Sequence, residues 1–274
     1  QHQEGQQVFE MVRAMKGLSP EIAASTYLME ARNFRSTGRI FEAQRALVEL
    51  ADRYPSSNYA PVALYEAALH EESRGSETGD REAVRLLERI VRDFPDHPLC
   101  FISKLRQGDL LRKVNEFASA VYLYETMIQE WAQDPRLPMV EMALGEAYFA
   151  LGTSRDNYTD EAVRVFERLL DLSSLSLDVR TEAGTKAASA LKRAGRNARA
   201  QDILWRVIHE SIRLAESDPD AIGPTGRYWL ARAILTLADN LRSQGDESQV
   251  RTLFEIMEAM ELPGKDLIYS PSGT

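Results

Sequence analysis

Cysteine and histidine are scarce in this sequence of 274 residues, which contains one Cys and four His. A single thiol cannot form an internal disulfide, a cysteine-based zinc site or a redox pair. The four His show no metal-binding spacing such as HExxH. No glycine-rich phosphate loop and no GxSxG motif is present either. We therefore expect no metal, no cofactor and no catalytic residues in this chain, and we expect that it is not an enzyme.

Long apolar runs and a surplus of basic residues are also missing. No stretch approaches the roughly 20 apolar residues that a transmembrane helix needs, so we expect no direct membrane insertion. The first residues, QHQEGQQVFE, lack the basic start and apolar stretch of a signal peptide; either such a segment was removed or the chain is part of a longer protein. The net charge is −9, with 42 acidic against 33 basic residues. Because a nucleic-acid partner requires a basic face, we expect no nucleic-acid binding.

The sequence does contain one segment that is repeated several times with variation. GRIFEAQRALVELADRYP (38–55) and GDREAVRLLERIVRDFP (79–95) are closely similar. In each, an Ala is followed after four and seven residues by large apolar residues, and then by Pro. Such spacing places the apolar residues on one stripe of a helix that ends before the Pro. The same frame begins at Ala43, Ala83, Ala120, Ala162, Ala200 and, with Val in place of Ala, at Val250.

A second apolar stripe precedes each of these helices. Several of these stripes end at Gly or Asn, as at Gly38, Asn115, Gly195 and Gly245. These residue types adopt the left-handed conformation that closes a helix at low steric cost. Small residues within the stripe, such as Gly184, would let two helices approach closely. Each unit is therefore predicted to be a helix, a tight turn and an antiparallel helix.

This arrangement resembles the tetratricopeptide repeat family, whose repeats combine aromatic and small residues in the first helix with an Ala and an aromatic residue in the second. One repeat supplies Tyr27, Ala31, Phe34, Ala43 and Pro55, with Glu30 where Leu is usual. Another supplies Leu144, Gly145, Tyr148, Gly152, Ala162 and Phe166, without the closing Pro. The resemblance covers almost the whole chain. It implies an all-α fold: a right-handed α-solenoid of antiparallel helix pairs with about six repeats and an N-terminal half repeat.

We expect a single repeat domain over residues 1–274. Its predicted parts are a half repeat at 6–20, repeats at about 21–55, 56–95, 98–135, 138–174, 176–215 and 225–263, and a tail at 264–274. The half repeat, read as the second helix of a pair closed by Pro20, would carry an apolar face without its neighbour. RGSETGD (74–80) and GTSRDNYTD (152–160) are predicted to be lengthened turns. The segment ESDPDAIGPTG (216–226) is rich in turn formers and is the expected hinge.

The resemblance further implies that the first helices line a concave groove that binds a protein or peptide partner. The side chains it places in that groove are Arg32, Arg35, Asp109, Arg112, Lys113, Glu146, Lys192, Arg193, Arg232, Asp239 and Arg242. For each of them an ordinary solvated helix face is the alternative. Together they describe a mixed-charge groove with basic clusters that suits a peptide bearing carboxylates. The groove-facing Asn of the chaperone-binding members is absent, so that subtype is not expected.

Six other side chains have both a packing and a functional interpretation. We expect His70 to be structural and Cys100 to act as a small hydrophobe, with a reactive thiol as its alternative. Trp229 follows the expected hinge and is either packed or an exposed anchor. A possible apolar patch, with core packing as its alternative, consists of Met139, Met142 and Phe149.

A second, shorter resemblance concerns RYPSSNYAPVALYEAA (53–68), which is similar to the Tyr-Pro-x-Ser-x-Tyr-Ala joints of bacterial envelope proteins. Those proteins include outer-membrane assembly lipoproteins and the coordinator of the Tol–Pal system, so this resemblance favours an exported or periplasmic location over a cytoplasmic one. The sequence thus predicts a non-enzymatic scaffold for a protein or peptide partner of unknown identity. The alternative is a non-catalytic repeat segment of a larger enzyme or of an envelope or secretion assembly.

Overall fold

The computed structural model describes residues 2–153, 156–218 and 220–264, and every regular element in these ranges is a helix. The chain divides into two compact units, residues 1–130 and 131–274. Unit 1 contains α1 (His2–Arg13), α2 (Pro20–Ser36), α3 (Ile40–Arg53), α4 (Tyr59–Ser73), α5 (Glu77–Asp93), α6 (Leu99–Lys113) and α7 (Phe117–Glu130). Unit 2 contains α8 (Leu137–Leu151), α9 (Asp156–Asp171), α10 (Leu177–Arg193), α11 (Asn197–Ser217), α12 (Pro224–Ser243) and α13 (Glu247–Ala259).

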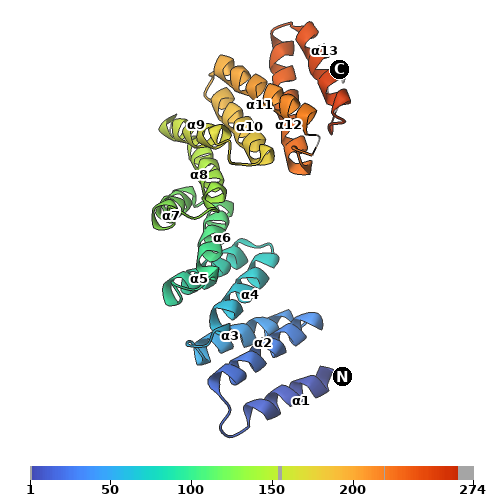
Figure 1. Cartoon of the computed structure of the whole chain (residues 1–274). Helices are drawn as coiled ribbons and strands as arrows, with labels where there is room; N and C mark the ends of the chain where they lie inside the picture. The colour runs from blue at the N-terminus through green and yellow to red at the C-terminus, as the bar shows by residue number, and fades with distance from the viewer. Residues whose placement is uncertain (1, 154–155, 219, 265–274) are drawn as a thin grey trace. The chain divides into compact units, whose positions relative to one another are not determined.

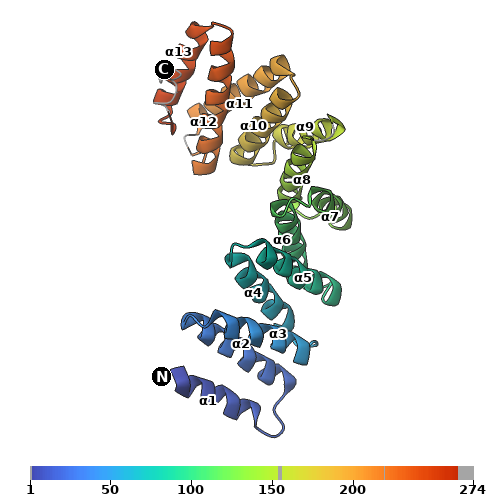
Figure 2. The same cartoon turned by 180° about the vertical axis from the view of Figure 1, so that it is seen from behind.

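Within each unit, successive helices pack against one another as antiparallel pairs (Figures 1 and 2). In unit 1 the pairs are α2–α3, α4–α5 and α6–α7, and the first helices also meet, α2 with α4 and α4 with α6. In unit 2 the pairs are α8–α9, α10–α11 and α12–α13, and α10 contacts α12. The predicted all-α fold of stacked helix pairs is confirmed.

The small residues of the repeated frame lie at the centre of the pairs. Ala43, Ala83, Ala120, Ala162 and Ala200 are all completely buried. No larger side chain fits at such a crossing without displacing its neighbours, because protein interiors are close-packed. These alanines therefore determine how closely the second helix of each pair approaches the helices around it.

The turns between paired helices follow the predicted chemistry. Gly38, Asn115, Gly195 and Gly245 have positive φ values of 76°, 63°, 73° and 80°. In each turn, the residue after the Gly or Asn donates its N–H to a carbonyl five residues before it, as Arg196 does to Leu191 over 2.9 Å. Such bonds satisfy carbonyl groups that the end of an α-helix leaves unpaired.

The N-terminal segment differs from the prediction in its boundaries. Helix α1 ends at Arg13, and Pro20 does not close it but occupies the first turn of α2, which Ser19 caps by accepting the N–H of Ile22. Pro is well suited to a first helical turn because its missing N–H would be unpaired there in any case. The expected unpartnered apolar face is present, since Val8, Met11 and Met15 are 54, 68 and 59% exposed.

Two predicted loops are shorter than expected because the helices extend into them. Helix α5 begins at Glu77 and is capped by Ser76, so much of the expected turn 74–80 is helical. Helix α11 continues to Ser217, and α12 begins at Pro224. The connection ends at Gly223, whose N–H donates to Oδ1 of Asp178 in α10 over 2.8 Å. Gly223, near the end of the segment predicted to be a hinge, is thus tied to α10.

Candidate partner-binding surface

The candidate surface consists of the exposed sides of the first helices, which we call the first-helix face of each unit. In unit 1 this face belongs to α2, α4 and α6, and its charges bridge neighbouring helix pairs. Nε of Arg32 lies 3.0 Å from Oε1 of Glu66 in α4. Nζ of Lys113 lies 2.7 Å from Oδ1 of Asp80, a carboxylate that is almost fully buried. These two predicted binding residues are therefore already neutralised within the protein.

Two more predicted residues, Asp109 and Arg112, belong to a small network in α6. The carboxylate of Asp109 accepts a hydrogen bond from the Tyr124 hydroxyl at 2.8 Å and one from Nη1 of Arg112 at 3.2 Å. Tyr124 is completely buried, and this burial, with the adjacent Asp109 carboxylate, raises the pKa of its hydroxyl. Asp109 and Arg112 thus hold a core tyrosine as well as facing solvent.

Arg35 is the predicted residue of unit 1 that stays free of carboxylates. It is exposed and has no ion-pair partner among the described residues. It lies near His70, which is buried as predicted, with no hydrogen bond to either ring nitrogen within the described structure. Burial, followed by the positive charge of Arg35, lowers the pKa of the His70 imidazole. His70 is therefore held neutral in the core.

In unit 2 the first-helix face belongs to α8, α10 and α12, and Lys186 lies at its centre. Nζ of Lys186 bonds to Glu146 of α8 and lies 2.5 Å from Oε1 of Glu182 on its own helix. The same ammonium lies 5.0 Å from the centre of the Trp229 ring in α12. Lys186 thus joins all three first helices, and it takes up the charge of the predicted residue Glu146.

Arg232 extends this arrangement along α12. Its guanidinium carbon lies 5.2 Å from the ring centre of Trp229 and 5.9 Å from that of Tyr228, and its Nη1 donates to the Tyr228 hydroxyl at 3.2 Å. Arg232 is exposed and has no carboxylate partner among the described residues. Tyr228 is 48% exposed and packs edge-on against Trp229, with ring centres 5.4 Å apart. We call Lys186, Tyr228, Trp229 and Arg232 the Trp229 platform.

The remaining predicted residues of unit 2 lie toward the ends of their helices. Arg193 places its guanidinium 3.5 Å from the centre of the Phe149 ring and donates to the Phe149 carbonyl, and burial lowers its pKa. Lys192 and Asp239 are exposed and Arg242 is half-buried. None of these last three has an ion-pair partner within the described residues.

The side chains with both a packing and a functional interpretation differ in their burial. Cys100 is buried, and this burial raises the pKa of its thiol, as expected for a small hydrophobe. Trp229 is half-buried beneath two cations and is thus neither fully packed nor fully exposed. Met139 is 55% exposed, whereas Met142 is half-buried.

Two members of the Trp229 platform, Lys186 and Tyr228, are absent from the predicted set. The signal for Lys186 was its position four residues after Glu182, which is the favourable order for an ion pair on a helix. Tyr228 was signalled by its place beside Trp229 and four residues before Arg232. Neither signal distinguishes a binding residue from ordinary surface. The contacts of Lys186 join different helix pairs, whereas those of Tyr228 lie within α12.

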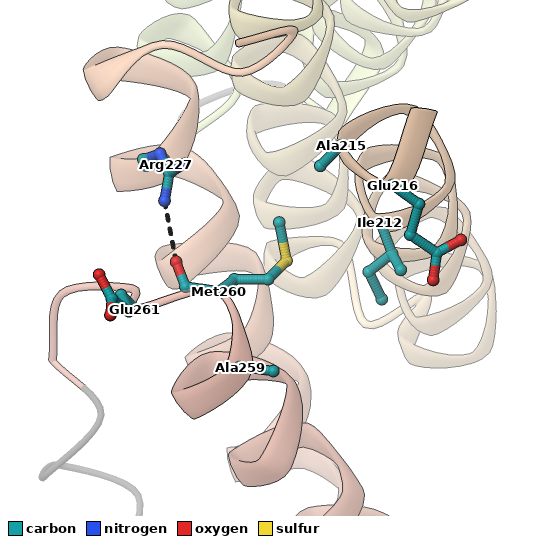
Figure 3. A pocket seen from close by; sticks show the side chains of 7 residues that line it. All are labelled: Ile212, Ala215, Glu216, Arg227, Ala259, Met260 and Glu261. Carbon is teal, nitrogen blue, oxygen red and sulfur yellow. Dashed lines mark hydrogen bonds between the residues drawn. The ribbon is translucent and has the colours of Figure 1, made fainter. Parts of the chain in front are cut away.

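One hollow of unit 2 is lined by none of the four residues of the Trp229 platform. It has a volume of about 380 Å³ and is formed by the end of α11, the start of α12 and the residues after α13 (Figure 3). Arg227 closes one side by donating from Nη1 to the Met260 carbonyl at 2.9 Å. The carboxylates of Glu216 and Glu261 also line the hollow, and it contains none of the predicted residues.

Two further findings concern metals and membranes. Among the described residues, no group of three or more His, Cys, Asp or Glu side chains is arranged to hold a metal ion. No helix in the described part of the chain is both long enough and apolar enough to cross a membrane.

Comparison with known proteins yields likeness in structure only. No protein-family model matches the sequence, and no curated protein matches it. The C-terminal part of a TPR repeat-containing protein from Cytophaga hutchinsonii matches with a TM-score of 0.64 and 16% identity, over 98% of this chain and 95% of that one. A tetratricopeptide repeat protein from Parabacteroides merdae matches with a TM-score of 0.54 and 16% identity, over 89% and 95% of the two chains.

A third similar structure is that of the nearly identical TPR-like repeats of a putative kinesin light chain from Podosopora anserina. It matches with a TM-score of 0.53 and 21% identity, over 74% of this chain and 99% of that one. These proteins share with this chain the stacking of helix pairs that the sequence predicted. The chain therefore has the tetratricopeptide-repeat fold, an α-solenoid of antiparallel helix pairs.

Proposed function

We propose that this chain is a non-enzymatic scaffold that binds a protein or peptide partner on its first-helix faces. The observation that carries the proposal is the Trp229 platform, where the exposed cation Arg232 is stacked on aromatic rings without a carboxylate partner among the described residues. Half-exposed aromatic residues with Arg are the combination that dominates binding energy at protein interfaces. The likeness in fold to tetratricopeptide-repeat proteins supports a scaffold role.

The predicted binding residues have different roles in this proposal. Arg32 and Lys113 tie neighbouring helix pairs together through Glu66 and Asp80, so they contribute mainly to stacking. Five basic residues lack a carboxylate partner among the described residues and are proposed to face the partner. They are Arg35, Lys192, Arg193, Arg232 and Arg242.

Affinity capture from the native organism, followed by mass spectrometry, tests this proposal. Wild-type protein is compared with Arg232→Glu and with Arg112→Glu, which alters a cation already bonded to Asp109. We expect at least one partner whose capture falls sharply with Arg232→Glu and falls less with Arg112→Glu. Capture should also weaken as salt is raised, because exposed charges are screened. Equal capture of every protein by all three baits would contradict binding through the first-helix face of unit 2.

Exposed apolar side chains on α1 and just after it favour the alternative role, a repeat segment of a larger assembly. Val8, Met11 and Met15 present an apolar surface that one more packed element would cover. In that role, Met11→Glu would abolish assembly with the neighbouring component while Arg232→Glu would leave it intact. Size-exclusion chromatography of the captured complexes distinguishes the two outcomes.

A further inference from the structure

The geometry points to a carboxylate-binding position at Arg232, and we infer that the ligand of the unit 2 first-helix face is an acidic peptide segment. This inference rests on the proposed function and specifies the chemistry of the partner. It follows from three features of the molecule: how Arg232 is held, where the nearby carboxylates are used, and how charge is distributed among the helices.

Arg232 is held in a position that leaves its hydrogen-bonding edge available. The guanidinium lies over the Trp229 and Tyr228 rings, and one of its N–H groups donates a hydrogen bond to the Tyr228 hydroxyl. An arginine has five N–H donors in a planar fork, so most of them remain available. Stacking on aromatic rings limits the rotamers of the side chain, and the fork matches a carboxylate in a bidentate geometry.

Two acidic residues that contact the platform are already bound to it. Glu146 and Glu182 both accept hydrogen bonds from Lys186, the second cation above the Trp229 ring. Lys186 therefore holds both carboxylates by hydrogen bonds, and its single positive charge balances one of the two negative charges. No carboxylate of the described residues pairs with Arg232, so a bound ligand can supply one.

The helices around Arg232 carry a basic surplus inside an acidic protein. Helix α10 contains four basic and two acidic residues, and α12 contains three basic and one acidic. Their paired second helices lack this surplus: α11 contains three basic and three acidic residues, and α13 contains one basic and three acidic. The third first helix, α8, contains Glu141 and Glu146 and no basic residue, so the contrast applies to α10 and α12. In a chain of net charge −9, it favours a ligand rich in Asp and Glu on these two helices.

The exposed ring of Tyr228 adds an apolar contact beside the cation. It is 48% exposed, and it lies next to the half-buried Trp229. A peptide in which an acidic residue is close to an aromatic or large aliphatic one would use both features. We expect that pairing in the preferred ligands.

Selection from a random peptide display library against the purified wild-type chain tests the inference. The peptides recovered should be enriched in Asp and Glu, with aromatic or large aliphatic residues nearby. Synthetic copies are then titrated by fluorescence anisotropy. Arg232→Glu should weaken their binding by about tenfold or more, and Arg232→Lys should weaken it less, because Lys keeps the charge but loses the fork.

The matched control is Arg251→Glu, which makes the same charge reversal at an exposed arginine of α13, a second helix of unit 2 outside the first-helix face. It should leave the affinity of these peptides nearly unchanged, and circular dichroism should show that all three variants are folded. Peptides without an acidic bias, or peptides bound equally by Arg232→Glu, would overturn the inference. A selection that recovers no binder would overturn it as well, whereas the scaffold proposal is decided separately by the capture of whole partners.

Discussion

Replacing Gly145 by Ala tests whether close approach of α8 and α9 requires the glycine. A Cβ added at Gly145 would lie 2.5, 2.8 and 2.9 Å from Cε1, Cζ and Cδ1 of Phe166. Phe166 is only 1% exposed, so its ring cannot move into solvent. The substitution should therefore destabilise unit 2, even though Ala is normally the better helix residue.

Two opposing contributions determine the size of the effect. Overpacking of a well-filled core costs about 1–3 kcal/mol, whereas Gly to Ala in a helix interior is favourable by about 1 kcal/mol. The net loss in the free energy of unfolding is then about 1 kcal/mol. Phe166→Leu removes the two nearest ring atoms, so in that background Gly145→Ala should stabilise the protein by up to about 1 kcal/mol.

Urea unfolding followed by circular dichroism at 222 nm provides the measurement for all four proteins: the wild type, each single variant and the double variant. The sign of the Gly145→Ala effect should reverse between the two backgrounds, which corresponds to a coupling energy of about 2 kcal/mol. If Gly145→Ala stabilises the protein equally in both backgrounds, the effects are additive. The glycine would then not be required by the contact with Phe166.

Three further predictions concern other parts of the chain. Ala200→Leu should overpack a fully buried crossing and lower the free energy of unfolding by about 1–3 kcal/mol, and an unchanged melting curve would refute the assigned crossing. Burial and Arg35 lower the pKa of His70 in the folded protein, so on acidification the unfolded chain takes up a proton at this residue before the folded chain does. The free energy of unfolding should therefore keep its full His70 contribution above about pH 6.5 and decrease as the pH drops below that value. The decrease should be smaller in His70→Leu. Asp178→Ala removes the acceptor of the Gly223 N–H, so that amide should exchange its hydrogen faster while amides in α2 stay unchanged.

The pairing of helices could be predicted from the sequence because its signals are local. The frame that begins at Ala43 and recurs to Ala200 requires only the three-to-four-residue period of a helix, and turn residues such as Gly195 report their own backbone preference. Helix ends were less accurate. Residues 216–226 contain turn formers, yet α11 continues to Ser217. The position at which a helix ends depends on its packing as well as on its local sequence.

The candidate surface could be predicted only in part. The sequence placed Arg32, Lys113 and Arg232 on first helices, but it did not separate the first two, which are bound to carboxylates, from the third. Glu66 follows Arg32 by 34 residues, and Glu146 precedes Lys186 by 40. No local pattern signals a contact over such a separation.

By itself, then, the sequence determined the helices, their antiparallel pairing and the small residues between them, because these depend on periods of three or four residues and on the conformational preferences of single turn residues. Only the tertiary structure decided which charges are neutralised and which remain available to a partner. The physical reason is that ion pairs and aromatic contacts between helix pairs form when stacking brings distant segments within a few ångströms. At the Trp229 platform, stacking brings Lys186 of α10 over Trp229 of α12. Arg232 is supported by two rings of its own helix and has no carboxylate partner among the described residues.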